Sequence, residues 1–125
     1  MASQSWPAEI RLVAGRRALA VTFEDGRAVT LPAELLRVES PSAEVQGHSP
    51  SEKRLISGKR DVAITAVEPV GNYAVKLVFD DGHSTGIFGW SYLAKLGQDP
   101  TGALERYRQQ LAAAGLSADP PSTRR

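Results

Sequence analysis

Short segments in which apolar and polar residues alternate run through the first half of the chain. The alternation covers residues 10–12, 19–23 and 29–31, and it has the two-residue period of strands that bury one face. Asp25-Gly26 separates the second segment from the third. An Asp-Gly pair between alternating segments indicates a β-hairpin, because both turn positions favour positive φ.

The second half of the chain repeats this pattern and adds helical segments. Residues 62–67 and 75–79 alternate again, and Asp81-Gly82 predicts a second hairpin. A short helix is expected after each hairpin, from Pro32 in the first case and over residues 90–96 in the second. The clearest helix covers residues 100–114, with Asp99 as its cap and Gly115 as its end.

Two stretches of the sequence resemble each other. Residues 21–36 and 77–93, which start 56 positions apart, both predict a strand, an acidic turn with Asp-Gly, a strand and a short helix. The similarity fits an internal duplication, and it also fits the general likeness of any two hairpins. Both interpretations predict an α+β fold with an antiparallel, partly barrel-like sheet built from β-hairpins, short helices and a C-terminal helix.

The boundaries of the domain follow from composition. Residues 6–116 are expected to form a single domain, between a flexible N-terminus (1–5) and a flexible, proline-rich C-terminal tail (117–125). Inside this domain, residues 39–60 show neither the two-residue period of a strand nor the 3.6-residue period of a helix. An irregular segment of this length is often functional or mobile.

Composition narrows the possible classes of protein. The 125 residues contain no cysteine, which excludes disulfides, thiolate metal sites and cysteine nucleophiles. A net charge of +1 gives no strong field, so nucleic acid is not an expected partner. No apolar stretch approaches the roughly 20 residues of a membrane span, and no secretory signal is visible, so we expect a cytoplasmic protein.

The common catalytic motifs are missing, and the candidates for chemistry are few. No P-loop, GxGxxG, GxSxG or HExxH sequence occurs. The two histidines, His48 and His83, could bind iron or zinc together with nearby carboxylates such as Glu44 and Asp81. Alternatively, His48 is a solvated loop residue, and His83 is a turn residue whose side chain forms a hydrogen bond with its own backbone.

Four basic residues lie close together in the irregular segment: Lys53, Arg54, Lys59 and Arg60. They could contact phosphate or an acidic protein, or they could form an ordinary solvated surface. No exposed aromatic residues are interleaved with them, as single-stranded nucleic acid binding would require.

Several segments together resemble the gamma-butyrobetaine hydroxylase-like N-terminal domain, in its stand-alone bacterial form. They are Leu36 to His48 (LRVESPSAEVQGH), Gly71 to Val75 (GNYAV), Phe79 to His83 (FDDGH) and Gly86 to Trp90 (GIFGW). In the hydroxylase this domain precedes an iron- and 2-oxoglutarate-dependent oxygenase domain and supports dimerisation. The oxygenase domain is absent here, so the resemblance does not imply an enzyme, although a homodimer is compatible with it.

The resemblance also implies a zinc site that this sequence has lost. The family's structural zinc is held by three cysteines, which fall on Ser40, Ser42 and Val45, and by a histidine, which falls on His83. Serine hydroxyls are poor zinc ligands and valine is none. We therefore expect no cofactor, and we expect hydrogen bonds from the serines to the turn at His83 instead of the metal.

These observations favour a non-catalytic binding or adaptor module with an unknown protein partner. Similar domains are fused to P-loop ATPases that carry iron–sulfur clusters, so the resemblance points to iron–sulfur assembly factors. The alternatives are a metal-binding protein that uses His48 and His83, or an enzyme for a small substrate at the same surface. The residues expected to form the binding surface are Arg37, Ser40, Ser42, His48, Lys59, Asp81, His83 and Trp90.

Overall fold

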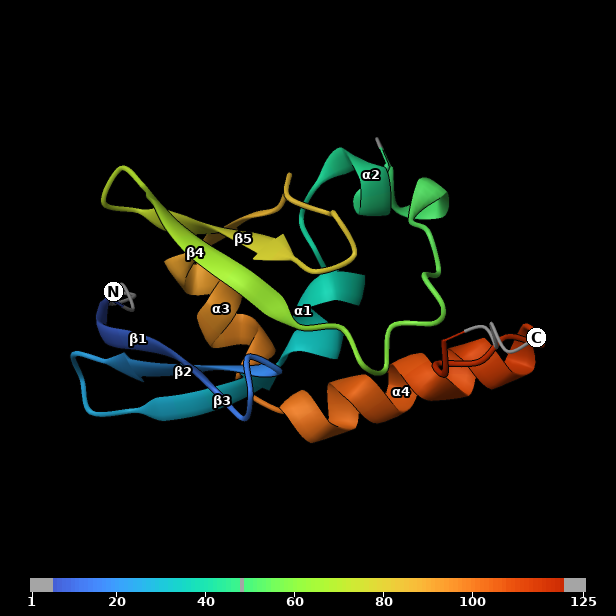
Figure 1. Cartoon of the computed structure of the whole chain (residues 1–125), viewed down its shortest axis with the longest axis horizontal. Coiled ribbons are helices and arrows are strands. Elements are labelled where there is room, and N and C mark those ends of the chain that lie inside the picture. The colour runs from blue at the N-terminus through green and yellow to red at the C-terminus, as the bar shows by residue number, and fades with distance from the viewer. Residues whose placement is uncertain (1–5, 48, 121–125) are drawn as a thin grey trace.

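The structure is a computed structural model that describes residues 6–47 and 49–120 (Figure 1). The strands are β1 (Pro7–Val13), β2 (Ala18–Phe23), β3 (Ala28–Pro32), β4 (Ile64–Val70), β5 (Ala74–Phe79) and β6 (Ile87–Gly89). The helices are α1 (Ala33–Val38), α2 (Ala43–Gln46), α3 (Trp90–Leu96) and α4 (Pro100–Ala113), with a 3-10 turn at Pro50–Glu52.

The predicted α+β fold with antiparallel strands is confirmed. The strands form two three-stranded sheets in the orders β1-β2-β3 and β4-β5-β6, rather than one closed barrel. Both predicted hairpin turns are present, and Gly26 and Gly82 each adopt φ 94°. An amino acid with a side chain rarely adopts this φ, which explains the glycine that follows each aspartate.

The two similar stretches of sequence form two similar units of structure. Each unit is a three-stranded antiparallel sheet followed by a short helix, α1 or α3, and β2 and β5 have the same burial pattern. The N–H of Phe23 donates to the carbonyl of Arg27 (2.7 Å), and the N–H of Phe79 donates to the carbonyl of His83 (2.9 Å). Arg27 and His83 are therefore equivalent turn residues. Arg27 is exposed and lies over the Phe23 ring, whereas His83 is buried.

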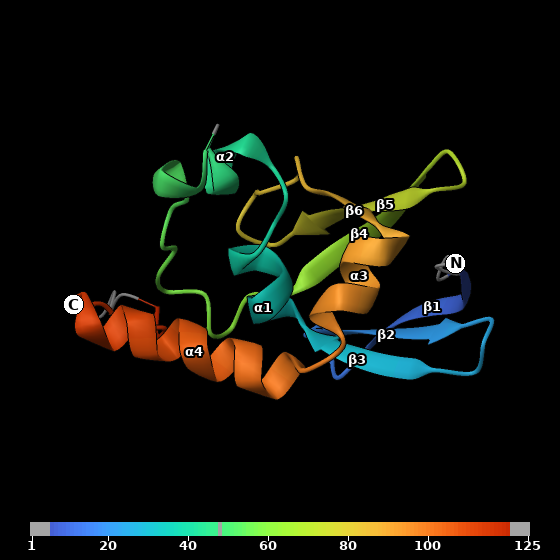
Figure 2. The same ribbon diagram turned by 180° about the vertical axis from the view of Figure 1, so that it is seen from behind.

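Both sheets and two of the helices share one apolar core (Figures 1 and 2). The inner faces of β2 and β5 meet there, together with buried side chains of α1 and α3. Its largest fully buried members are Phe23, Phe79, Phe88, Leu19, Leu31, Leu35, Leu36, Ile64, Leu77 and Leu93. Because each unit buries its apolar face against the other, neither sheet could form a stable core alone.

Helix α4 packs on a second, smaller apolar cluster. Val38, Tyr107, Leu111 and Ala118 form it, with Leu55, Ile56 and Leu104 at its edge. Asp99 caps α4 as predicted, accepting a hydrogen bond from the N–H of Gly102 at 3.1 Å. Figure 1 shows α4 running beneath α1 and reaching the segment that descends from α2.

The domain continues beyond the boundary that composition indicated at Leu116. Ala118, in the segment predicted to be a flexible tail, is only 4% exposed. The carbonyls of Ser117 and Ala118 accept hydrogen bonds from the N–H groups of Gly58 (2.9 Å) and Arg60 (2.8 Å). The polar and proline-rich composition hid the one small apolar residue that anchors the segment.

An ion pair between Arg108 and Glu34 ties α4 to α1. The side chain of Glu34 is 5% exposed, and its Oε1 lies 2.5 Å from Nη2 of Arg108. We expect Arg108→Met to lower the free energy of unfolding by about 1–2 kcal/mol, because it leaves a buried carboxylate without its cation. Urea denaturation checks this. The double variant Glu34→Gln/Arg108→Met should recover part of the loss, and a double variant less stable than Arg108→Met would contradict this account of the pair.

In the described part of the chain, no helix is both long and apolar enough to cross a membrane.

Candidate functional site

The irregular segment 39–60 is fixed to the second hairpin turn through His83. The ring of His83 lies against its start, with Nε2 at 3.0 Å from Oγ of Ser40 and at 3.4 Å from Oγ of Ser42. On the other side of the ring, Nδ1 lies 3.0 Å from Oε1 of Glu44. We call these four residues the His83 network. It contains the hydrogen bonds from the serines that the sequence led us to expect.

The contacts of the ring fix its protonation. A carboxylate only accepts, so Glu44 requires a proton on Nδ1, and Nε2 then accepts from the Ser40 hydroxyl. Burial lowers the pKa of His83, and the charge of Arg37 lowers it further, against the opposing effects of Glu44 and Asp81. His83 is therefore a neutral imidazole at pH 7, with a defined tautomer.

This lowered pKa gives stability a specific pH dependence. Below the ordinary histidine pKa of 6.5, the unfolded chain binds a proton that the folded chain resists. The contribution of His83 is therefore complete above pH 6.5 and is lost as the pH falls from there toward the lowered pKa. We expect the free energy of unfolding, measured by urea denaturation between pH 7.5 and 5, to fall more steeply for the wild type than for His83→Gln. Parallel profiles would contradict a buried neutral His83.

Asp81, two residues before His83, joins several groups at the turn. Its Oδ2 lies 2.7 Å from Nε of Arg37 and 2.7 Å from Nζ of Lys59, and its Oδ1 accepts from the N–H of His83 at 3.0 Å. Burial acts to raise the pKa of Asp81, but the bonds from Lys59, the His83 backbone and Arg37 outweigh it and lower the pKa to about 2. The Asp81 carboxylate is therefore ionised. It links the hairpin turn to α1 through Arg37 and to segment 39–60 through Lys59.

Ser40, His83 and Glu44 are hydrogen-bonded in the sequence of a serine nucleophile, a base and an acid. The exposure of the serine and the acid, however, is the opposite of that in a hydrolase. In a hydrolase the serine faces the substrate while the acid is buried. Here Ser40 is 0% exposed, and the side chain of Glu44 is 64% exposed. A Cβ built on Gly86 would lie only 2.3 Å from Oγ of Ser40, so the backbone of Gly86 packs directly against this hydroxyl. The arrangement is suited to holding two segments together.

The same geometry tests the family's zinc site. Two of the expected ligand positions, Ser40 and Ser42, do lie beside Nε2 of His83, and Val45 is buried at 1% exposure. Their donor set is two neutral hydroxyls, one imidazole and a hydrocarbon, which does not fit zinc. The residues described by the structure contain no group of three or more His, Cys, Asp or Glu that could hold a metal ion.

The other predicted surface residues are placed differently. Ser40, Ser42 and His83 are buried under the surface they were expected to form, and His48 lies outside the described residues. Trp90 is distant from Asp81. The residue before it, Gly89, pairs with Ala74 at one end of β5, whereas Asp81 follows the other end, a separation of roughly 17 Å. The indole of Trp90 instead donates to the carbonyl of Asn72 at 2.9 Å.

The basic cluster is mostly neutralised within the chain. Lys53 pairs with Glu39 (2.7 Å), Lys59 pairs with Asp81 and Arg60 pairs with Asp119. Three of its four cations therefore have internal acidic partners, which explains why the sequence pattern alone does not identify a phosphate site.

Sequence reasoning missed two features of this region. One is the close approach of Gly86 to Ser40, which no motif announced. The other is a cavity of about 360 Å³ between residues 53–56 and α4. Its signal was the apolar pair Leu55-Ile56 inside an otherwise polar segment, which indicates partial burial.

A profile of the family "gamma-butyrobetaine hydroxylase-like, N-terminal" matches residues 10–94. The match includes the whole His83 network and ends before α4. No curated protein matches the chain.

Solved structures share both fold and sequence with this chain. Two solution NMR structures are each 43% identical, one with a TM-score of 0.81 over 97% of this chain and 95% of that chain, the other with 0.79 over 98% and 93%. A crystal structure of a protein of unknown function from Acidithiobacillus ferrooxidans, assigned to the DUF971 family, is 42% identical. It covers 74% of this chain and 92% of that chain, with a TM-score of 0.62.

Proposed function

The chain belongs to the gamma-butyrobetaine hydroxylase-like N-terminal family, and on this premise we propose that it is a non-catalytic binding module that presents segment 39–60 to a protein partner. The family match covers the segment and the hairpin that holds it, but carries no activity with it. The proposal therefore rests on the site.

The observation that supports it most strongly is the closed His83 network. The serine, histidine and acid that come closest to a catalytic arrangement are used to fasten one segment to another, and the serine is fully buried. Asp81 adds a second fastening through Arg37 and Lys59. A long segment fixed in this way loses less conformational entropy when a partner binds, which favours affinity.

Among the described residues of the segment, the longest exposed run is Ser51–Arg54. It carries Lys53, whose side chain is 40% exposed, and Arg54. Two adjacent exposed cations favour a partner with an acidic patch, which would speed encounter and set orientation. The resemblance to domains fused with iron–sulfur P-loop ATPases makes an assembly factor of that kind the first partner to test.

Affinity purification tests the proposal. The wild-type chain, Lys53→Glu/Arg54→Glu and the control Lys95→Glu/Arg106→Glu would serve as baits, because the control makes the same charge change on exposed helix positions outside the segment. We expect one protein to be retained by wild type and control and lost with the segment variant, and the purified pair to bind in titration calorimetry. Equal retention by all three baits, or no specific protein, would overturn the proposal.

The metal-binding alternative has less support in the described residues. Both ring nitrogens of His83 already have hydrogen-bond partners, and the carboxylate of Asp81 is held by two cations. A metal would have to displace these contacts. We therefore do not advance it as a second function.

A further inference from the structure

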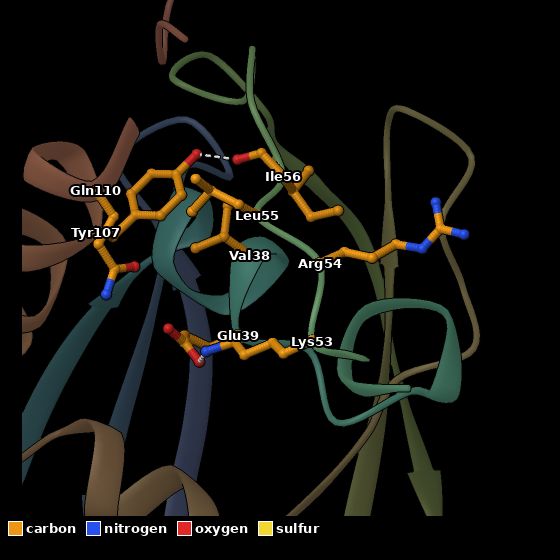
Figure 3. Close-up of a pocket in the computed structure, with 8 residues that line it drawn as sticks. All are labelled: Val38, Glu39, Lys53, Arg54, Leu55, Ile56, Tyr107 and Gln110. Carbon is orange, nitrogen blue, oxygen red and sulfur yellow. Dashed lines mark hydrogen bonds and ion pairs between the residues drawn. The ribbon is translucent and has the colours of Figure 1, made fainter. Parts of the chain in front are cut away.

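A cavity beside the irregular segment is large enough for a small molecule. Residues 53–56 and α4 border this cavity, which has a volume of about 360 Å³ (Figure 3). Val38, Glu39, Lys53, Arg54, Leu55, Ile56, Tyr107 and Gln110 line it. The volume lies at the small end of the range for ligand pockets. It equals the volume of about a dozen water molecules at roughly 30 Å³ each.

One part of the lining is apolar and held in place. Val38 and Tyr107 are 2% and 4% exposed, and Figure 3 shows Val38 and Leu55 beside the Tyr107 ring. The Tyr107 hydroxyl donates to the carbonyl of Ile56, which ties α4 to the segment. Because this hydroxyl already has its acceptor, the tyrosine contributes its ring to the cavity. An apolar group that entered would bury its surface against a formed wall.

The charges that border the cavity cancel. Nζ of Lys53 lies 2.7 Å from Oε1 of Glu39, and both residues line the cavity. The Arg54 guanidinium extends away from the other lining side chains (Figure 3). Burial, followed by the nearby charge of Glu34, raises the pKa of Tyr107 to about 12, so this group is uncharged at pH 7. The lining therefore presents one ion pair and no unbalanced charge.

This ion pair disfavours a charged ligand. A carboxylate that approached Lys53 would also approach Glu39, and an ammonium that approached Glu39 would also approach Lys53. Either ion would meet repulsion together with attraction, and it would lose water on entering. A hydroxyl or an amide can instead donate to the Glu39 carboxylate and accept from a remaining ammonium proton of Lys53, without breaking the pair. The polar group that suits this side of the cavity is therefore uncharged.

We propose that this cavity binds a small uncharged molecule with an apolar body and one hydroxyl or amide group, and that the Lys53–Glu39 pair excludes charged analogues. The body packs against Val38, Leu55 and the Tyr107 ring, and the polar group meets the ion pair. Burial of the body gives affinity, and the balanced pair gives selectivity. This site goes beyond the proposed function, because it needs no protein partner.

Part of the lining lies outside the region that matches the family. The match ends at residue 94, whereas Tyr107 and Gln110 come from α4. The cavity therefore depends on the C-terminal helix of this chain.

Three probes with similar phenylalkyl bodies test the inference: 3-phenylpropan-1-ol, 3-phenylpropionate and 3-phenylpropylamine. Methyl and amide NMR spectra of the full chain would be followed during titration. We expect saturable shifts with the alcohol, with Kd about 1 mM or tighter. Intermolecular NOEs should join its ring to the methyl groups of Val38 and Leu55. The carboxylate and the amine should each bind at least about threefold more weakly than the alcohol.

Two variants should change this selectivity in opposite directions. Glu39→Gln leaves Lys53 without its carboxylate, so 3-phenylpropionate should gain at least about threefold in affinity relative to the alcohol. Lys53→Met leaves Glu39 without its cation, so the amine should gain by a similar factor. Glu105→Gln and Lys95→Met make the same charge changes at exposed helix positions outside the cavity, and they should keep the selectivity of the wild type.

Amide spectra of each variant confirm that it is folded before its titration is interpreted. The inference would be overturned if the alcohol gave no saturable shifts, if the three probes bound equally well, or if Glu39→Gln and Glu105→Gln had the same selectivity.

Discussion

Replacing His83 by alanine is expected to lower the free energy of unfolding by about 3 kcal/mol and the Tm by roughly 10 °C. The change removes a buried ring that touches Ser40, Ser42 and Glu44, and it leaves the Ser40 hydroxyl buried without its acceptor. Segment 39–60 loses its main attachment to the hairpin. Chemical denaturation monitored by circular dichroism measures the loss.

The first of the two similar units, formed by β1, β2, β3 and α1, provides a matched control. Arg27 occupies the turn position equivalent to His83, with the same backbone hydrogen bond to a preceding phenylalanine. It is exposed, so Arg27→Ala should cost less than about 1 kcal/mol. If the two alanine variants lost similar stability, His83 would have no special structural role and the network would not hold the segment.

Replacing Gly86 by alanine is expected to cost about 2 kcal/mol or more. The new Cβ would lie 2.3 Å from Oγ of Ser40 and 3.0 Å from the Phe88 ring. Ser40 is fully buried and bonded to His83, so its hydroxyl cannot move away without breaking that bond. The backbone must shift instead.

A double-mutant cycle tests this clash. Ser40→Ala removes the oxygen and leaves only its Cβ, 3.4 Å from the added methyl group. Gly86→Ala should then cost about 1–2 kcal/mol less in the Ser40→Ala background than in the wild type. Additive effects, measured by urea denaturation of all four proteins, would show that Gly86 and Ser40 do not make the close contact.

Local rules were sufficient for most of the fold. The alternation of apolar residues, the Asp-Gly pairs and the Asp99-Pro100 start of α4 each depend on neighbours within a few positions, and the structure contains all of them. The internal similarity also proved to be structural, because both units repeat the same turn contacts. The split into two sheets was not predictable, since it depends on how two complete units pack.

The site was only half predictable for a similar reason. The resemblance to the family correctly predicted that Ser40, Ser42 and His83 lie close together. We placed them on a binding surface, however, and in the structure all three are buried. Whether a residue lies on or under a surface depends on distant segments, here the approach of Gly86. We expected Trp90 to lie beside the hairpin turn because it is close to Asp81 in the sequence. The register of β6 instead places the preceding residue, Gly89, opposite Ala74, at the end of β5 that is remote from the turn.

The His83 network occupies the positions at which the resemblance to the family implies a zinc site. Zinc would join three positions of the segment to one histidine, and here two hydroxyls and a carboxylate make the join through a neutral ring. Hydrogen bonds of this kind need no metal supply, and they are sensitive to pH instead.

The most direct test of this account is the protonation state of His83, read from the long-range proton–nitrogen NMR spectrum of its ring with and without zinc. The account predicts a neutral ring at pH 7 with the proton on Nδ1, a pKa below 6.5, and a spectrum unchanged by stoichiometric zinc or by a chelator. A ring protonated at pH 7, a proton on Nε2, or saturable shifts at one equivalent of zinc would contradict it.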